Sequence, residues 1–203
     1  MFLANRHFQL SQMIKDFSNQ AKISGAKFIL EKTPRHIWHI DYIRRVQISP
    51  RFIVTTRDGR EVIASLYERL GDFEASCQRY LDDSFMSLRQ LDMNDTRLIK
   101  LEQFSTEPRQ ELAAVFKWLG LRFEEGVLDY HKQPISWNLI NSGDKSDNTS
   151  HDLKRNMQVN SELAPAKSHW RERLPNKFHK DLYKMFEGDG VGRRVMQQFG
   201  YDV

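Results

Sequence analysis

Residues 51–71 read RFIVTTRDGREVIASLYERLG and carry the clearest signals of secondary structure in the chain. The first seven residues are rich in β-branched and aromatic side chains, which favour a strand. Apolar residues from Val62 to Leu70 then recur at four-residue steps, as on one face of a helix, and Gly71 is a typical helix end. The stretch therefore predicts a strand over 51–57 that leads directly into a helix.

The same unit of strand and helix occurs on both sides of this stretch. Two more β-rich runs lie at residues 27–31 and 96–102, and helical periodicity follows each of them. The further helices are expected between Pro34 and Pro50, over residues 72–91, and from the N-cap residues Ser105 and Thr106 to Gly120. Alternating strands and helices are typical of a parallel sheet covered by helices. The sequence thus predicts an α/β domain with three layers, a parallel sheet flanked by helices.

Cationic and hydroxyl side chains follow two of the predicted strands. Lys32 comes just after the first strand, Arg57 ends the second, and Ser65 lies in the first part of the next helix. Ligands of parallel sheets bind at the carboxyl ends of the strands, and an Arg with a hydroxyl near a helix start suits a phosphate. The alternative is that Arg57 pairs with a carboxylate and Ser65 only packs against a neighbour.

Several motifs together resemble one known family. EKTP at residues 31–34 and RDGREVIAS at residues 57–65 are similar to the EKTP and RDPRDVxxS motifs of sulfotransferases that use 3′-phosphoadenosine 5′-phosphosulfate (PAPS). The segments that resemble further motifs of this family are IKLEQF (99–104), FKWLGL (116–121), SHWRERL (168–174) and FGY (199–201). The resemblance spans residues 27–201 and points to the heparan-type and bacterial branch of the family.

The resemblance implies a reaction and a set of site residues. Arg57 and Ser65 would bind the 3′-phosphate of the nucleotide, and Lys32 would be catalytic beside the transferring sulfuryl group. Trp170 and Arg171 would belong to a loop that closes over the nucleotide. PAPS would be the co-substrate, and the acceptor would be a hydroxyl or amine of a small molecule, glycan or peptide. Cationic side chains suffice to neutralise charge in such a transfer, so no metal is expected.

The sequence departs from the family pattern at two points. Gly59 stands where the family usually has Pro, which leaves the phosphate-binding side chains in place. No PxSGTT loop for the 5′-phosphosulfate precedes residues 31–34, where the sequence instead predicts a helix. The expected fold is therefore a P-loop-like sulfotransferase fold that is incomplete on its N-terminal side. A second hypothesis is that the domain is catalytically incomplete and binds the nucleotide or a partner. In that case an unpaired sheet edge is expected to lead to self-association.

Length and composition bound the remaining possibilities. With 203 residues, 39% of them hydrophobic, and one Cys, the chain predicts a single domain over residues 1–203, a packing role for Cys77 and a mobile loop at 136–150. The net charge of +4 comes from interleaved basic and acidic residues, which favours a small anionic ligand over a nucleic acid. No apolar run approaches the roughly 20 residues of a membrane span, and no signal peptide is evident. A cytoplasmic protein is therefore expected.

Overall fold

The protein is described by a computed structural model that covers residues 2–26, 28–33, 36–46, 49–133, 157 and 159–202. The loop expected at residues 136–150 lies outside the described residues. The two strands are β1 (Phe52–Thr56) and β2 (Thr96–Lys100). The α-helices are α1 (Phe2–Ser24), α2 (Ile40–Val46), α3 (Gly59–Leu70), α4 (Phe73–Leu88), α5 (Leu101–Thr106), α6 (Pro108–Leu119), α8 (Trp170–Arg173), α9 (His179–Phe186) and α10 (Val191–Gln198). The 3-10 helices are η1 (His36–His39), η2 (Glu125–Lys132) and η3 (Asn176–Phe178).

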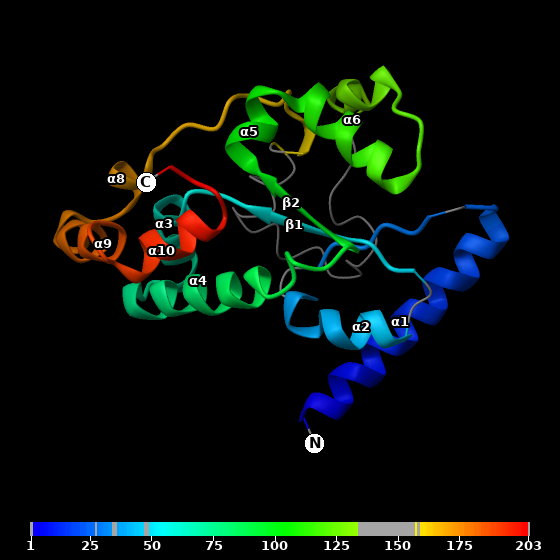
Figure 1. Ribbon diagram of the computed structural model, residues 1–203, viewed down its shortest axis with the longest axis horizontal. Helices are drawn as coiled ribbons and strands as arrows, with labels where there is room; N and C mark the ends of the chain where they lie inside the picture. The colour runs from blue at the N-terminus through cyan, green and yellow to red at the C-terminus, as the bar shows by residue number, and fades with distance from the viewer. Residues whose placement is uncertain are drawn as a thin grey trace, which may run out of the picture.

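The sheet confirms the predicted fold class. Strands β1 and β2 pair in parallel, with Phe52 opposite Thr96 and Thr56 opposite Lys100. They cross the middle of the molecule, with α2 and α4 on one side and α5 and α6 on the other (Figure 1). The chain is thus an α/β domain whose parallel sheet is flanked by helices.

The strand expected at residues 27–31 is not formed. Residues 28–33 have no regular secondary structure, and the sheet in the described part of the chain has two strands. The side chains of this segment are largely exposed, with 89% of Leu30 and 51% of Phe28 accessible to water. A strand is stable only when its backbone groups pair with a neighbour, and no described strand lies beside this segment. The β-rich composition of this segment alone is therefore not sufficient to form a strand.

Helices α3 and α4 confirm the predicted helices that follow β1. The carboxylate of Asp58 caps α3 by accepting from the backbone N–H of Arg60 at 2.8 Å. Gly71 ends this helix in the left-handed conformation, with φ of 70°, as the sequence predicts. Asp72 then caps α4 by accepting from the N–H of Ala75 at 3.0 Å. These caps fix where each helix begins and ends.

The N-cap predicted at Ser105 and Thr106 is wrong. Both residues lie inside α5, where their hydroxyls donate to the carbonyl of Glu102 at 2.9 Å. This bond to an earlier carbonyl satisfies the hydroxyl within its own helix. Helix α6 begins instead at Pro108, with Glu107 as a cap residue whose side chain makes no capping bond. The third predicted strand is also shorter than expected, since it ends at Lys100.

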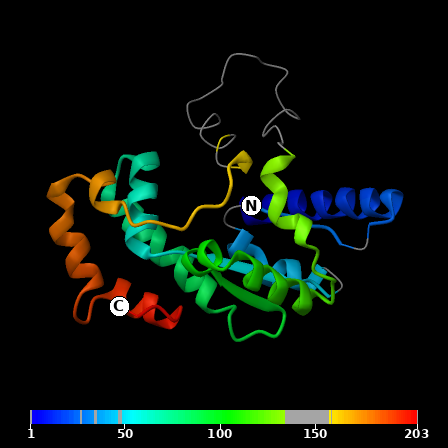
Figure 2. The ribbon, with the colours of Figure 1, turned by 90° about the horizontal axis from the view of Figure 1, so that it is seen from above.

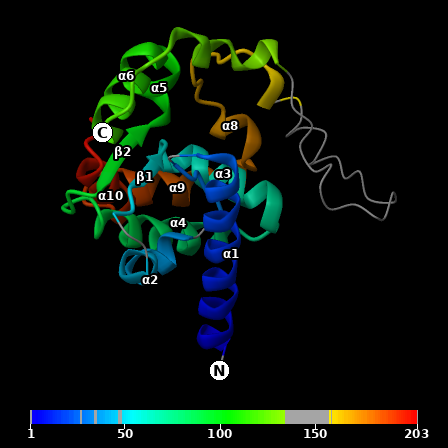
Figure 3. The same cartoon turned by 90° about the vertical axis from the view of Figure 1, so that its right-hand side faces the viewer.

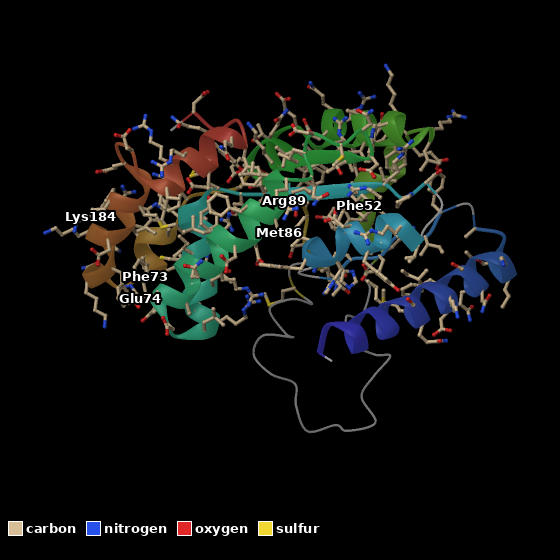
Figure 4. All side chains as sticks on the ribbon, turned by 60° about the horizontal axis from the view of Figure 1, so that its bottom comes forward. Phe52, Phe73, Glu74, Met86, Arg89 and Lys184 are labelled. Carbon is tan, nitrogen blue, oxygen red and sulfur yellow. The ribbon has the colours of Figure 1, made fainter. Side chains whose placement is uncertain are left out.

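The buried core is centred on α3 rather than on the sheet. Ile63 and Ala64 of α3 have no accessible surface, and Trp170 from α8 and Val195 from α10 are 1% exposed. Leu182 of α9 completes this cluster from the fourth helix. In Figure 4, α4 runs beneath this region from Phe73 and Glu74 at one end to Met86 and Arg89 at the other. The C-terminal helices therefore belong to the same packed unit as the β1–α3 turn.

Gly59 is required at the start of α3 by close packing. A Cβ atom built on Gly59 would lie 2.4 Å from both Cζ and the hydroxyl of Tyr80 and 2.7 Å from Cε1 of Phe186. Distances this short are not tolerated without movement of both rings. The two aromatic rings thus occupy the space that a side chain would need here, which explains why the residue is not Pro.

Helix α1 stands apart from the rest of the molecule. It extends away from the sheet and the C-terminal helices (Figure 2, Figure 3). The hydroxyl of Ser11 contacts that of Tyr42 on α2, and Leu10 is buried to 6% exposure. Across the described residues, no helix combines the length and apolar character needed to span a bilayer.

Candidate functional site

The carboxyl ends of the two strands are joined by one carboxylate. The backbone N–H of Asp58, just after β1, donates to Oε1 of Glu102 at 2.8 Å. Glu102 lies in the first turn of α5, directly after β2, and its Oε2 accepts from the hydroxyl of Tyr201 at 2.8 Å. Burial raises the pKa of Tyr201 well above its usual range, so this hydroxyl stays protonated and donates. Glu102 thereby fixes the β1 turn to the C-terminal end of the chain.

The turn after β1 also holds a buried glutamate, Glu61, which is 2% exposed. Its Oε1 accepts from the N–H of Trp170 at 2.6 Å, from the N–H of His169, and from the hydroxyl of Ser168 at 3.3 Å. These donors lie at the start of α8, more than a hundred residues further along the chain. Glu61 therefore anchors the late segment of the chain against α3.

Arg57 meets this same carboxylate. Its Nη2 donates to Oε2 of Glu61 at 2.9 Å and to the carbonyl of Lys167 at 3.4 Å. Arg173 of α8 approaches Oε2 of Glu61 at 3.4 Å and pairs with Glu68 at 2.6 Å. Within the described part of the chain Arg57 donates through Nη2 alone, so its Nε and Nη1 groups have no partner among these residues. The side chain of Arg57 is 28% exposed, which leaves it accessible from solvent.

Comparison with known proteins identifies the family. Residues 3–125 match a family described as the Sulfotransferase family, which is more than half of the chain. The chain belongs to the sulfotransferase family. The branch of the family, which the sequence motifs placed near the heparan type, stays a prediction.

A solved structure resembles this sulfotransferase over most of its length. It is the sulfotransferase domain from the Synechococcus PCC 7002 olefin synthase, with a TM-score of 0.61 and 14% sequence identity. The likeness covers 93% of this chain and 64% of the other, so this chain spans less than two thirds of that domain. At this identity the comparison shows the fold. No curated protein matches the sequence.

The residues that the sequence predicts to bind the nucleotide lie in different environments. Ser65 is exposed on α3, one helical turn after Glu61 and on the same face. Trp170 is 1% exposed, and its ring packs edge-on against His179 and Tyr183. Trp170 is therefore a core residue in this structure, and its contact with a nucleotide stays a prediction.

Arg171, the neighbour of Trp170, is exposed and lies over an aromatic pair. Its guanidinium carbon is 4.5 Å from the centre of the Trp170 ring, and its Nε donates to the hydroxyl of Tyr183 at 2.9 Å. Stacking on an aromatic ring keeps an Arg extended while leaving its charge in water. The charge of Arg171 is thus held on the same late segment that Glu61 anchors, and its role at a nucleotide stays a prediction.

Lys32 lies in the exposed segment that precedes η1 rather than at a strand end. Its neighbours are organised around Glu31, which accepts from Thr33 Oγ1 at 2.5 Å and pairs with His36 Nδ1 at 2.7 Å. Lys32 itself is exposed. The described partners of Arg57 are Glu61 and Lys167, so the predicted placement of Lys32 beside Arg57 stays a prediction.

The most informative residues beside Arg57 are ones that the sequence motifs do not single out. Glu61 is four residues after Arg57 and pairs with it at 2.9 Å, although Arg57 itself precedes α3. Its main donors, however, are backbone groups of residues 169 and 170, which carry no sequence signal. Among the described residues, no three His, Cys, Asp or Glu side chains form a group that could hold a metal ion.

Proposed function

We propose that this sulfotransferase binds PAPS and transfers its sulfuryl group to a hydroxyl of an acceptor. One observation carries the proposal, the position of Arg57 at the carboxyl end of β1 with Nε and Nη1 left for an anion. A guanidinium with two such groups matches the oxygens of a phosphate, and the start of α3 adds the positive end of its dipole. Ser65 on α3 supplies a hydroxyl on the exposed face. Arg57 and Ser65 would thus bind the 3′-phosphate.

The reaction that follows is an in-line substitution at sulfur. The acceptor oxygen forms a bond to sulfur while the bond from sulfur to the bridging oxygen of the 5′-phosphate breaks. The products are the sulfate ester, 3′,5′-bisphosphoadenosine (PAP) and the proton that the acceptor hydroxyl loses. Catalysis of such a transfer rests on positioning and on neutralising the charge that develops on the leaving oxygen. Lys32 would supply that charge once its exposed segment lies against the bound donor.

The experiment that tests the proposal is calorimetric titration of the protein with PAP and with adenosine 5′-phosphate, which lacks the 3′-phosphate. We expect saturable binding of PAP that Arg57→Ala weakens about tenfold to a hundredfold, since a charge-assisted contact contributes about 1.5–3 kcal/mol. The same substitution should leave the binding of adenosine 5′-phosphate unchanged. Arg109→Ala is the matched control, because Arg109 is 68% exposed and its ion pair with Glu125 lies on the surface.

Two results would overturn the proposed nucleotide site. The first is that the folded protein does not bind PAP saturably. The second is that Arg57→Ala and Arg109→Ala bind PAP as tightly as the unchanged protein does. Circular dichroism of each variant establishes that it is folded before the titration is interpreted.

A catalytically incomplete, nucleotide-binding domain is the second candidate function. It is favoured by the way the two described strands end, β1 in the Arg57–Gly59 turn and β2 directly in α5. Neither end is a glycine-rich loop with successive backbone N–H groups for the phosphosulfate. Release of PAP from PAPS in the presence of acceptors distinguishes the two candidates. Binding of PAP without turnover would favour the second one.

A further inference from the structure

A cleft of about 560 Å³ lies beside the proposed nucleotide site. Its floor includes Thr55 of β1 and Ile99 of β2, which are opposite each other in the sheet and so face the same side. One wall is the stripe of α3 that contains Val62 and Leu66, and the other is α4. Arg57 also lines the cleft. This volume is in the range of small-molecule sites, and the shared arginine places the cleft next to the nucleotide.

The lining of the cleft is mainly apolar. Val62 and Leu66 face it from α3, and Leu101, Phe104 and Phe199 close it from α5 and the C-terminal end. The stripe of α3 that runs from Val62 to Arg69 rises about 10 Å, at 1.5 Å per residue. An extended alkyl chain of medium length therefore fits along this wall, and its burial would favour binding.

The charged residues of the cleft are mostly basic. Arg57, Arg69 and Arg79 line it, whereas Asp83 is the one carboxylate among its lining residues. Arg79 lies 3.6 Å from Asp83 as an ion pair, and its Nε has no hydrogen-bond partner in the described part of the chain. The guanidinium of Arg79 is therefore able to donate to another acceptor. Glu61 pairs with Arg57 and Asp83 with Arg79, so part of this positive charge is neutralised. The basic residues that line the cleft still outnumber its one carboxylate, which favours an anionic ligand over an amine.

A buried hydroxyl in the same cleft also lacks a partner. Tyr80 lines the cleft and is 4% exposed. Its hydroxyl lies near Ser84 but makes no hydrogen bond of regular geometry to the described residues. Burial raises the pKa of Tyr80 far above its usual range, so the group is a neutral donor. A buried donor without an acceptor is destabilising, and an acceptor oxygen of a ligand would offset this cost.

We infer that this cleft binds the sulfuryl acceptor and that the acceptor is a hydroxylated compound with an extended apolar body and a carboxylate. The inference rests on the proposed function, which it deepens by naming the class of acceptor. The apolar body lies along Val62 and Leu66 of α3. The carboxylate accepts from Arg79 and from the hydroxyl of Tyr80, and Arg57 joins the cleft to the nucleotide. An amine acceptor is disfavoured because it would add positive charge to a basic cleft.

The inference is tested by binding alone, with two probes of equal length, decanoate and decanol. Both are titrated calorimetrically against the full chain, without nucleotide. We expect decanoate to bind about tenfold more tightly than decanol, as a charge-assisted contact predicts. Arg79→Gln should remove this preference, Tyr80→Phe should weaken decanoate about fivefold with little effect on decanol, and the exposed control Arg109→Gln should change neither.

Several outcomes would overturn the inference. Equal affinity for the two probes, no saturable binding, or unchanged decanoate binding in folded Arg79→Gln and Tyr80→Phe would each do so. A dimer in analytical ultracentrifugation that decanoate does not dissociate would assign the cleft to a second copy of the chain. If Arg79→Gln does not fold, the two probes are titrated against the unchanged protein at increasing ionic strength. Rising ionic strength should reduce its preference for decanoate.

The two proposals fail in distinguishable ways. Decanoate selectivity without PAP binding would retain the acid-binding cleft and reject the nucleotide site. PAP binding without decanoate selectivity would retain the nucleotide site and reject the acid-binding cleft. When both bind, a hydroxydecanoic acid should be converted to its sulfate ester in the presence of PAPS, and decanol should be converted more slowly.

Discussion

Replacing Glu61 by Gln isolates the carboxylate that holds the β1 turn to the C-terminal segment. The substitution keeps the size of the side chain and removes its charge. Glu61 accepts from the late segment through Oε1 and from Arg57 and Arg173 through Oε2. A Gln amide has one acceptor oxygen and one NH₂ group. Its NH₂ group would therefore point at N–H donors, either those of the late segment or those of the two arginines, and could not accept from them. No rotation of the amide satisfies both sides.

The size of the effect follows from the burial of the partners. Removing one member of a buried ion pair costs about 3–5 kcal/mol. Arg57 and Arg173 are 28% and 25% exposed, so water replaces part of the lost interaction. We therefore expect the lower end of that range, about 3 kcal/mol of unfolding free energy, or about 7 °C in Tm for a chain of this length.

Urea unfolding followed by circular dichroism measures this loss, and Glu68→Gln is the matched control. Glu68 pairs with the same Arg173 but is 49% exposed, so its change should cost less than about 1 kcal/mol. Glu61→Gln should also make the backbone N–H groups of His169 and Trp170 exchange faster with solvent, since they lose their acceptor. Equal losses of stability in the two variants would refute the anchoring role of Glu61.

Two further predictions concern packing and titration. Gly59→Ala should destabilise the fold by about 1–3 kcal/mol, because its Cβ would overlap Tyr80 and Phe186. Gly126→Ala is the control and should not destabilise it, because a Cβ there meets nothing within 4 Å. Thermal melts of the two variants measure the difference. Burial raises the pKa of the Cys77 thiol from 9.0 to about 11, so the neutral thiol contributes stability that is complete below pH 9 and is lost as pH rises towards 11. Urea unfolding of the unchanged protein should therefore become easier across this window, more so than in Cys77→Ser, and parallel pH profiles would contradict the assignment.

The β1–α3–α4 part of the fold could be predicted because its signals are local. The β-branched run, the four-residue steps and the caps Asp58, Gly71 and Asp72 each act within a few residues of where they stand. Arg57 follows from the same logic, since it is the residue at which the strand ends. The structure confirms these elements with shifts of one to three residues at their ends.

The parts that sequence reasoning missed depend on partners far along the chain. Residues 28–30 have the composition of a strand, but a strand needs a neighbour to satisfy its backbone, and composition carries no record of that neighbour. The late W-R motif carries no signal for the core packing of Trp170, while the predicted contact of this residue with a nucleotide stays a prediction. The anchoring role of Glu61 has no sequence signal, because the donors that define it are backbone N–H groups, which nearly every residue has.

The pairing of Arg57 with Glu61 and its proposed role at a phosphate are compatible. Without an acidic partner, Arg57 and Arg173 would stand close together at one site and repel each other. Glu61 neutralises that repulsion and fixes the guanidinium of Arg57 through Nη2, so less side-chain entropy remains to be lost when a ligand binds. Since Nε and Nη1 are not used by Glu61, a phosphate gains contacts without breaking the existing pair. The carboxylate partner that the sequence left as an alternative for Arg57 is therefore compatible with the phosphate ligand that we propose for it.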